Sequence, residues 1–258
     1  MLRERLIQSL EESCPLHLQE EWDNCGFQVD TGKSDFKCAL VALEITDAVI
    51  NEAIEIGADL IITHHPLIFS AIKKIKADDV TGRYICKLIR NNISVYTCHT
   101  NFDKMDGGNN DYIGFLLNLE EVRPFDEDNG FCRKGETPFE VTFLEVMHKV
   151  AEVFEIEEKY FKTVGDLSKT IETIGWCSGA GTEFLEAARR EGCDLFITGD
   201  LKYHEAQLAK ELGLCVLDAG HYGSEKIFVE NMAAMLREEV FDADVDVMES
   251  VVDINPFK

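Results

Sequence analysis

The sequence predicts an α/β fold of two related α/β subdomains, with a metal site between them at the C-terminal ends of strands. Apolar, strand-like runs alternate with helix-like segments along the 258 residues, which is typical of α/β proteins with largely parallel sheets. A helix–strand pattern in the first half recurs in the second half. Histidines and carboxylates follow several predicted strands, at the edge of an α/β sheet where ligands collect.

Hydrophobic periodicity, capping residues and turn residues place the expected elements. The expected helices cover residues 2–13, 46–56, 78–91, 112–119, 137–153, 182–191, 204–212 and 224–240. The expected strands cover residues 36–45, 59–63, 93–99, 170–177, 194–198, 214–217 and 245–252. Between residues 124 and 138 the composition shifts to Asp, Glu, Asn, Gly and Lys. We therefore expect a boundary there, with subdomains at 1–125 and 126–258.

The repeat supports two related subdomains. In residues 52–63 a helix ends at a glycine, and Asp-Leu-Ile-Ile-Thr follows. In residues 186–198 a helix also ends at a glycine, and Asp-Leu-Phe-Ile-Thr follows. In each half the next predicted strand leads to a histidine, His99 or His221. Two matches in the same order indicate two related α/β subdomains that face each other.

Composition limits the class of protein and its partners. The net charge of −24 disfavours non-specific binding to nucleic acid or anionic membranes. Hydrophobic residues make up 45% of the chain, and no apolar run approaches membrane-spanning length, so a soluble protein is expected. The nine cysteines form no C-x-x-C pair, and the N-terminal segment lacks the apolar core of a signal peptide. We therefore expect free thiols and a cytoplasmic location.

The pair His64-His65 is the strongest candidate site. It follows an apolar strand and precedes Pro66. Neighbouring side chains on a strand point to opposite faces, so both imidazoles can serve one site only if the strand ends there. Alternatively, each histidine serves a different metal ion. An isolated pair is also compatible with two exposed histidines in a turn.

Further candidate ligands follow other predicted strands. Asp103 follows the strand that leads to His99, and His221 and Glu225 are four residues apart at a helix start, so both can face one side. Taken singly, His221 is compatible with a helix-terminal histidine, Glu225 with a favourable first-turn charge and Asp103 with an ordinary turn. Together with the histidine pair they indicate Zn, Mn, Fe or Co rather than Ca or Mg. Bridging carboxylates make two ions about 3.5–4 Å apart plausible. His99 and His204 are expected to orient ligands or to move protons.

Short motifs over nearly the whole chain match the pattern of one family. They are Trp22-Asp23-Asn24-x-Gly26, Ala42-Leu43-x-Ile45-Thr46, Thr63-His64-His65-Pro66-Leu67, His99-Thr100-Asn101-x-Asp103, Gly107-Gly108 with Asn110-Asp111, Thr198-Gly199-Asp200-x-x-Tyr203-His204-Glu205 and Gly220-His221-Tyr222-x-Ser224-Glu225. In these motifs the chain resembles the Nif-three-like dinuclear-metal family, also catalogued as GTP cyclohydrolase 1 type 2 homologs. The resemblance implies the metal ligands His64, His65, Asp103, His221 and Glu225, with Asp103 and Glu225 as the bridging groups. It also implies two related α/β subdomains and a ring-shaped homohexamer with metal sites facing an internal cavity.

The resemblance implies a hydrolase-like protein with two divalent transition-metal ions per chain. Its substrate would be a purine nucleotide or a related small molecule. In a cyclohydrolase, metal-bound hydroxide attacks C8 of the guanine ring and formate leaves, with His99 or His204 moving protons. Two other functions stay open. One is a non-catalytic metal-binding protein, either a metal carrier or a partner-binding scaffold. The other is a toroidal nucleic-acid binder, which the net charge of −24 disfavours.

A triphosphate substrate lacks an obvious binding element in the sequence. The chain has no P-loop motif. Lys104, Lys202 and the backbone amides of the Gly-rich turn 178–182 are candidates for holding phosphate, although such glycines more often just permit a tight turn. The chain also departs from the family pattern in two ways. Glu44 stands where relatives usually carry Asp, and the chain lacks the extra domain that some members insert between the halves.

Overall fold

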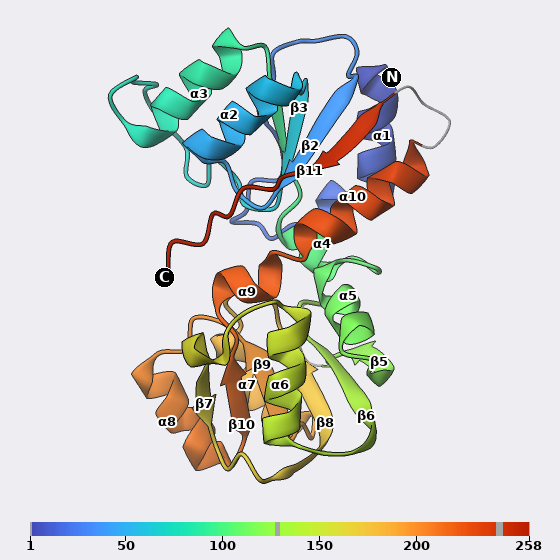
Figure 1. Cartoon of the computed structure of the whole chain (residues 1–258), viewed down its shortest axis with the longest axis vertical. Helices are drawn as coiled ribbons and strands as arrows, with labels where there is room; N and C mark the ends of the chain where they lie inside the picture. The colour runs from blue at the N-terminus through green and yellow to red at the C-terminus, as the bar shows by residue number, and fades with distance from the viewer. Residues whose placement is uncertain (1, 127–129, 241–244, 258) are drawn as a thin grey trace. The chain divides into compact units, whose positions relative to one another are not determined.

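A computed structural model describes residues 2–126, 130–240 and 245–257. The chain forms two compact units, one of residues 1–105 and 228–258 and one of residues 106–227. Each unit contains one mixed β-sheet with helices packed on it (Figure 1). The predicted α/β class is confirmed, with mixed rather than wholly parallel sheets. None of the helices in the described ranges is long and apolar enough to cross a membrane.

The first unit is built on a five-stranded sheet in the order β1-β4-β3-β2-β11. Strands β4, β3, β2 and β11 are parallel, and β1 runs antiparallel to β4. The strands are β1 (Gly26–Val29), β2 (Cys38–Ala42), β3 (Leu60–Thr63), β4 (Ser94–Thr97) and β11 (Asp246–Glu249). The helices are α1 (Arg3–Ser13), η1 (Leu16–Leu18), α2 (Asp47–Ile56), α3 (Val80–Arg90), α4 (Thr100–Lys104) and α10 (Phe228–Glu239).

The second unit is built on a six-stranded sheet in the order β5-β6-β8-β9-β10-β7. Strands β8, β9 and β10 are parallel, and β5, β6 and β7 pair antiparallel with their neighbours. The strands are β5 (Glu120–Pro124), β6 (Arg133–Thr142), β7 (Lys162–Val164), β8 (Thr170–Trp176), β9 (Leu195–Thr198) and β10 (Cys215–Asp218). The helices are α5 (Asn109–Leu116), α6 (Phe143–Val153), η2 (Glu158–Tyr160), η3 (Thr182–Phe184), α7 (Leu185–Arg190), α8 (Tyr203–Leu212) and α9 (His221–Glu225).

The C-terminal part of the chain belongs to the first unit. Strand β11 pairs in parallel with β2, from Asp246 opposite Cys38 to Glu249 opposite Val41. Helix α10 is tied to this strand, because Arg237 Nη2 donates to the Val247 carbonyl at 2.9 Å. This grouping differs from the expected subdomains 1–125 and 126–258. The difference arises because β11 completes the edge of a sheet whose other strands all lie within residues 26–97.

The helix expected at residues 137–153 is wrong in its first turn and a half. Strand β6 continues through Pro138 to Thr142 before α6 begins at Phe143. The β6–β8 register shifts between Glu136 and Val141, and such an irregularity tolerates a proline, which cannot donate a ladder hydrogen bond. A capping box between Thr142 and Glu145 then starts α6.

The helix expected at residues 224–240 is also corrected. The structure divides this segment into α9, which begins at His221, and α10, which begins at Phe228. Ser224 lies inside α9, and its hydroxyl donates to the Gly220 carbonyl at 3.0 Å instead of capping a helix. Strands β1, β5, β6 and β7 have no counterpart in the sequence-based prediction. They are short, irregular or exposed, as in β5, where all five residues are exposed.

The repeated Asp-Leu motif has the same structural role in each unit. Asp59 Oδ2 accepts hydrogen bonds from the amides of Lys37 and Cys38, at 2.6 and 3.1 Å, where β2 starts. Asp194 Oδ2 accepts from two amides where β8 starts, at 3.1 and 3.2 Å. Each aspartate therefore fixes the beginning of the strand next to its own. A common origin of the two units stays a prediction.

Candidate metal centre

The first unit gathers three histidines at one edge of its sheet. His64 and His65 follow β3, and His99 lies two residues beyond β4. These strands are parallel, with Thr63 opposite Thr97, so their carboxyl ends meet. The candidate ligand atoms of the three imidazoles lie within 4.8 Å of one another. Because β3 ends at Thr63, the alternation of a strand no longer separates the adjacent histidines.

His64 is held in one orientation in the interior. Its side chain is fully buried, and its Nδ1 lies 3.0 Å from the Cys98 carbonyl oxygen. A carbonyl only accepts, so Nδ1 carries the proton and Nε2 offers its lone pair. Nε2 lies 3.6 Å from Oδ1 of Asp103, a residue of helix α4. His64 and Asp103 thus present a nitrogen and an oxygen donor side by side.

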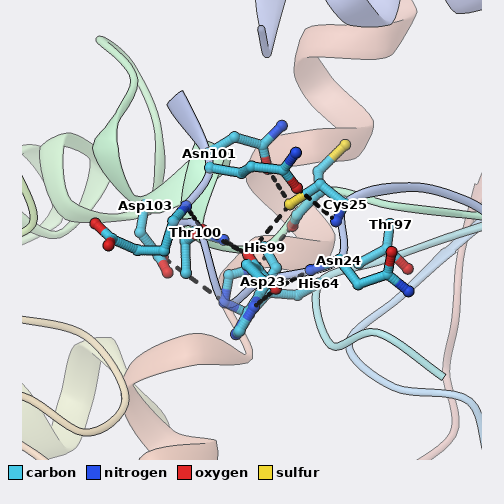
Figure 2. A network of polar contacts seen from close by, with 12 residues as sticks. Asp23, Asn24, Cys25, His64, Thr97, His99, Thr100, Asn101 and Asp103 are labelled. Atoms are coloured by element: carbon cyan, nitrogen blue, oxygen red, sulfur yellow. Dashed lines mark hydrogen bonds and ion pairs between the residues drawn. The ribbon is translucent and has the colours of Figure 1, made fainter. Parts of the chain in front are cut away.

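His99 is oriented by a buried carboxylate. Its Nδ1 lies 2.9 Å from Asp23 Oδ1, and Asp23 Oδ2 accepts from the amide and hydroxyl of Thr100 at 3.1 and 2.5 Å (Figure 2). Burial acts to raise the pKa of Asp23, but the hydrogen bonds from His99 and Thr100 outweigh it and hold that pKa below its usual range. The ionised carboxylate keeps the proton of His99 on Nδ1 and leaves Nε2 as the donor atom. Asp23 thus orients His99, a role that the sequence analysis did not predict, since it named Asp23 only as part of the motif Trp22-Asp23-Asn24-x-Gly26.

Glu44 lies beside the histidine cluster. Its Oε2 is 3.8 Å from Nδ1 of His65, and its side chain is half exposed. The glutamate, which follows β2, therefore lies close to the imidazole that follows the neighbouring strand β3. At this distance the carboxylate adds negative charge beside the His65 imidazole.

The second unit supplies a histidine–carboxylate pair at the start of α9. His221 Nε2 lies 3.0 Å from Glu225 Oε2, and this carboxylate is buried. On the other side of the ring, Nδ1 lies 2.8 Å from Asp200 Oδ2. Asp200 adopts a left-handed backbone with φ 58°, which is uncommon for a residue other than glycine. A strained residue that orients a histidine is typical of a functional site.

Three amides of the Gly-rich turn 178–182 are engaged within the protein, and phosphate binding there stays a prediction. The amides of Ser178, Gly179 and Gly181 already donate to side-chain oxygens, at 2.8–2.9 Å. The acceptors are Asn110, Ser224 and Thr198. Lys104, another candidate for phosphate, forms an ion pair with Glu20. Gly179 lets the turn lie against a candidate ligand, because a Cβ built there would be 2.1 Å from Glu225 Oε1.

The donors fit a divalent transition metal. The first unit offers imidazole nitrogens beside the Asp103 carboxylate, and the second offers His221 with Glu225. Mixed imidazole and carboxylate sets suit Zn, Mn, Fe and Co. His204, expected as a proton carrier, is exposed in the first turn of α8, where its ring lies 5.3 Å from that of Tyr203.

Comparison with known proteins identifies the family. The family described as Duf34/NIF3 (NGG1p interacting factor 3) matches residues 1–256. A Clostridium perfringens protein named "GTP cyclohydrolase 1 type 2 homolog" is 36% identical over 98% of this chain and 97% of its own length. A Streptococcus pneumoniae protein of the same name is 36% identical over 100% of this chain and 99% of its own length. The crystal structure of a hypothetical Staphylococcus aureus protein has a TM-score of 0.94 at 26% identity, covering 100% of this chain and 99% of that one. The chain therefore belongs to the DUF34/NIF3 family.

Proposed function

We propose that the chain is a dinuclear metal-dependent hydrolase-like protein. Its proposed ligands are His64, His65, Asp103, His221 and Glu225, with two divalent transition-metal ions per chain. The observation that carries the proposal is the clustering of three imidazoles beside Asp103 at one sheet edge. The assignment of both ligand sets to one centre, with Asp103 and Glu225 bridging, rests on their donor types and on their matching places after the strands of the two units.

The surrounding side chains support this chemistry. When bound, the ions would lower the pKa of water and stabilise developing negative charge. Asp23 holds His99 with Nε2 available, so His99 can accept or deliver a proton at that atom. Asp200 holds His221 with Nε2 facing Glu225. Each unit thus pairs a histidine of the proposed site with an orienting carboxylate, so little reorganisation is needed when a substrate or metal ion binds.

The proposed substrate is a purine nucleotide or a related small molecule. The support is the name of the bacterial relatives, GTP cyclohydrolase 1 type 2 homolog. In that reaction water adds at C8 of the guanine ring, and that carbon leaves as formate once both of its bonds to nitrogen have been hydrolysed. His99 would carry the proton that the attacking water loses, and His204 is the second proposed proton carrier.

We also propose that the chain assembles as a homohexamer and is cytoplasmic. The support for the location is that all nine cysteines, which lie within the described ranges, are free thiols. Light scattering coupled to size-exclusion chromatography tests the assembly. A hexameric mass supports it, and a monomeric mass at micromolar concentration contradicts it.

Elemental analysis tests the metal centre. We expect about two transition-metal ions per wild-type chain, and clear loss of metal in His64→Ala and in Glu225→Ala. The matched controls are His148→Ala and Glu230→Ala, which remove a surface histidine and a helix α10 glutamate. Both controls are expected to keep the wild-type metal content. Metal near zero that reconstitution cannot restore would overturn the hydrolase proposal.

Formate release tests the reaction in the reconstituted protein. Formate release is measured with guanine nucleotides and pterin precursors, and phosphate release is measured with phosphoesters, whose hydrolysis yields no formate. Hydrolysis that is lost in both ligand variants and kept in both controls supports the enzyme. Tightly bound metal with no turnover on any of these classes contradicts it and indicates a metal-binding protein instead.

A further inference from the structure

Two large aromatic side chains lie exposed next to the histidine cluster. Trp22 is 56% exposed and Phe69 is 54% exposed. Their ring centroids are 5.9 Å apart with the planes inclined at 51°. The Trp22 ring also meets the His99 ring edge-on, at 6.2 Å and 75°. The two rings therefore adjoin the histidine cluster of the first unit and are not an isolated surface feature.

Hydrogen bonds hold the two aromatic residues in place. Asn24 Nδ2 donates to the Ile68 carbonyl at 2.7 Å, and the Ile68 amide donates to Gln28 Oε1 at 3.1 Å. Gln28 Nε2 donates back to the Asn24 carbonyl at 2.6 Å. These bonds tie the segment that carries Trp22 to the segment that carries Phe69. The rings stay exposed on a preorganised frame instead of collapsing onto the surface.

The same frame is anchored to the candidate reaction centre. Asp23, the residue after Trp22, binds the Nδ1 of His99 and both donors of Thr100 (Figure 2). The backbone at Trp22 and the imidazole of His99 are thus fixed by one buried carboxylate. A flat ring that stacks on Trp22 would be presented beside His99 without further ordering of the protein.

Exposed aromatic faces that are rigid and adjacent to catalytic groups bind flat rings well. Base–aromatic stacking contributes about 1–3 kcal/mol for each ring and tolerates different bases, because every base has a π-face. Burying the exposed faces of Trp22 and Phe69 also removes apolar area from water. Aliphatic or purely anionic ligands would gain neither contribution from this pair.

We propose that Trp22 and Phe69 form a stacking platform for a planar nitrogen heterocycle, such as a purine or pterin ring, and that this ring belongs to the substrate. The platform determines specificity for the ring and makes no contact with the bonds that break. Its catalytic consequence rests on the proposed function, whereas ring binding needs no metal. The two proposals can therefore fail separately.

Tryptophan fluorescence provides a direct test. The chain has two tryptophans, and Trp176 is fully buried, so emission from an exposed indole reports on Trp22, as a Trp22→Phe variant verifies. The metal-free full-length chain is titrated with guanosine and adenosine, with inorganic tripolyphosphate as the ligand that lacks a ring. We expect saturable quenching by both nucleosides and none by tripolyphosphate.

Variants identify the second ring of the platform. Phe69→Ala is expected to raise the nucleoside Kd roughly 5- to 150-fold, the loss of one stacking partner. The matched control is Phe115→Ala, which removes an exposed phenylalanine from another aromatic pair, with Tyr112 at 5.9 Å. The control is expected to bind nucleosides as the wild type does. The emission of buried Trp176 shows in each variant that the second unit is folded.

The outcomes separate the two proposals. Unchanged Trp22 emission with both nucleosides, or equal effects of Phe69→Ala and Phe115→Ala, would overturn the platform. Bound metal and formate release in a protein that shows no quenching would refute the platform and leave the hydrolase proposal standing. Saturable quenching in a chain that reconstitution cannot load with metal would support the platform and refute the hydrolase proposal.

Discussion

Gly179 is the position where a single methyl group should disturb the candidate metal centre most selectively. It has φ 62°, and a Cβ built there would lie 2.1 Å from Glu225 Oε1 and 3.0 Å from its Cδ. In Gly179→Ala the carboxylate must therefore retreat by roughly 1 Å, a displacement that can cost about 100-fold in activity. The left-handed backbone adds a cost of about 1–2 kcal/mol in stability. The Glu225 side chain can move to relieve the clash. The substitution should therefore affect the position of the Glu225 carboxylate more than the stability of the fold.

Gly213→Ala separates backbone strain from ligand displacement. Gly213 has φ 66° at the end of α8, and a Cβ there would meet nothing within 4 Å. Both variants should lose similar stability in urea unfolding, about 1–2 kcal/mol. Chelator competition should show at least a tenfold loss of metal affinity for Gly179→Ala, and wild-type affinity for Gly213→Ala. Equal metal affinity of the two variants would refute this account of Glu225.

Two further variants test how carboxylates orient and stabilise their partners. Asp200→Asn replaces the charged acceptor of the His221 Nδ1 proton by a neutral amide, so metal affinity should fall about 10–100-fold in chelator competition; an unchanged affinity would contradict the orienting role of the charge. Asp59→Asn tests a stabilising charge, because burial acts to raise the pKa of Asp59 but Lys33 and two backbone amides lower it. The ionised form then stabilises the fold above the unfolded-state pKa of about 3.9 and ceases to do so as the pH falls through the lower folded-state pKa. Urea unfolding should show Asp59→Asn about 2 kcal/mol less stable at pH 7, with the two proteins converging in acid; a difference that is independent of pH would contradict the assignment.

Strands and helix caps that depend on residues adjacent in the sequence could be predicted. The strands β3 and β9 are continuous apolar runs that follow a glycine helix stop, and both were expected. Thr46 was expected to cap α2, and its side chain accepts the Val49 amide. The bulged strand β6 was mistaken for the start of a helix, because Thr137-Pro138 is also a common helix start. Pairing with β8 outweighed that local preference.

The sequence by itself determined which side chains stand at the ends of the strands. A strand that stops at Thr63 leaves His64 and His65 at its carboxyl end, and the spacing of His221 and Glu225 puts both on one side of a helix. These features follow from a few adjacent residues, so a pattern in the chain is enough to find them. The candidate metal ligands of each unit are features of this kind.

Only the tertiary structure decided what holds those side chains in place. Asp23 binds His99 across 76 positions and Asp200 binds His221 across 21, and β11 completes a sheet edge that begins at β2. Such pairings depend on the order of strands in a sheet, and no local periodicity encodes that order. The orientation and protonation of the candidate ligands are therefore consequences of the fold, because burial and distant carboxylates set them.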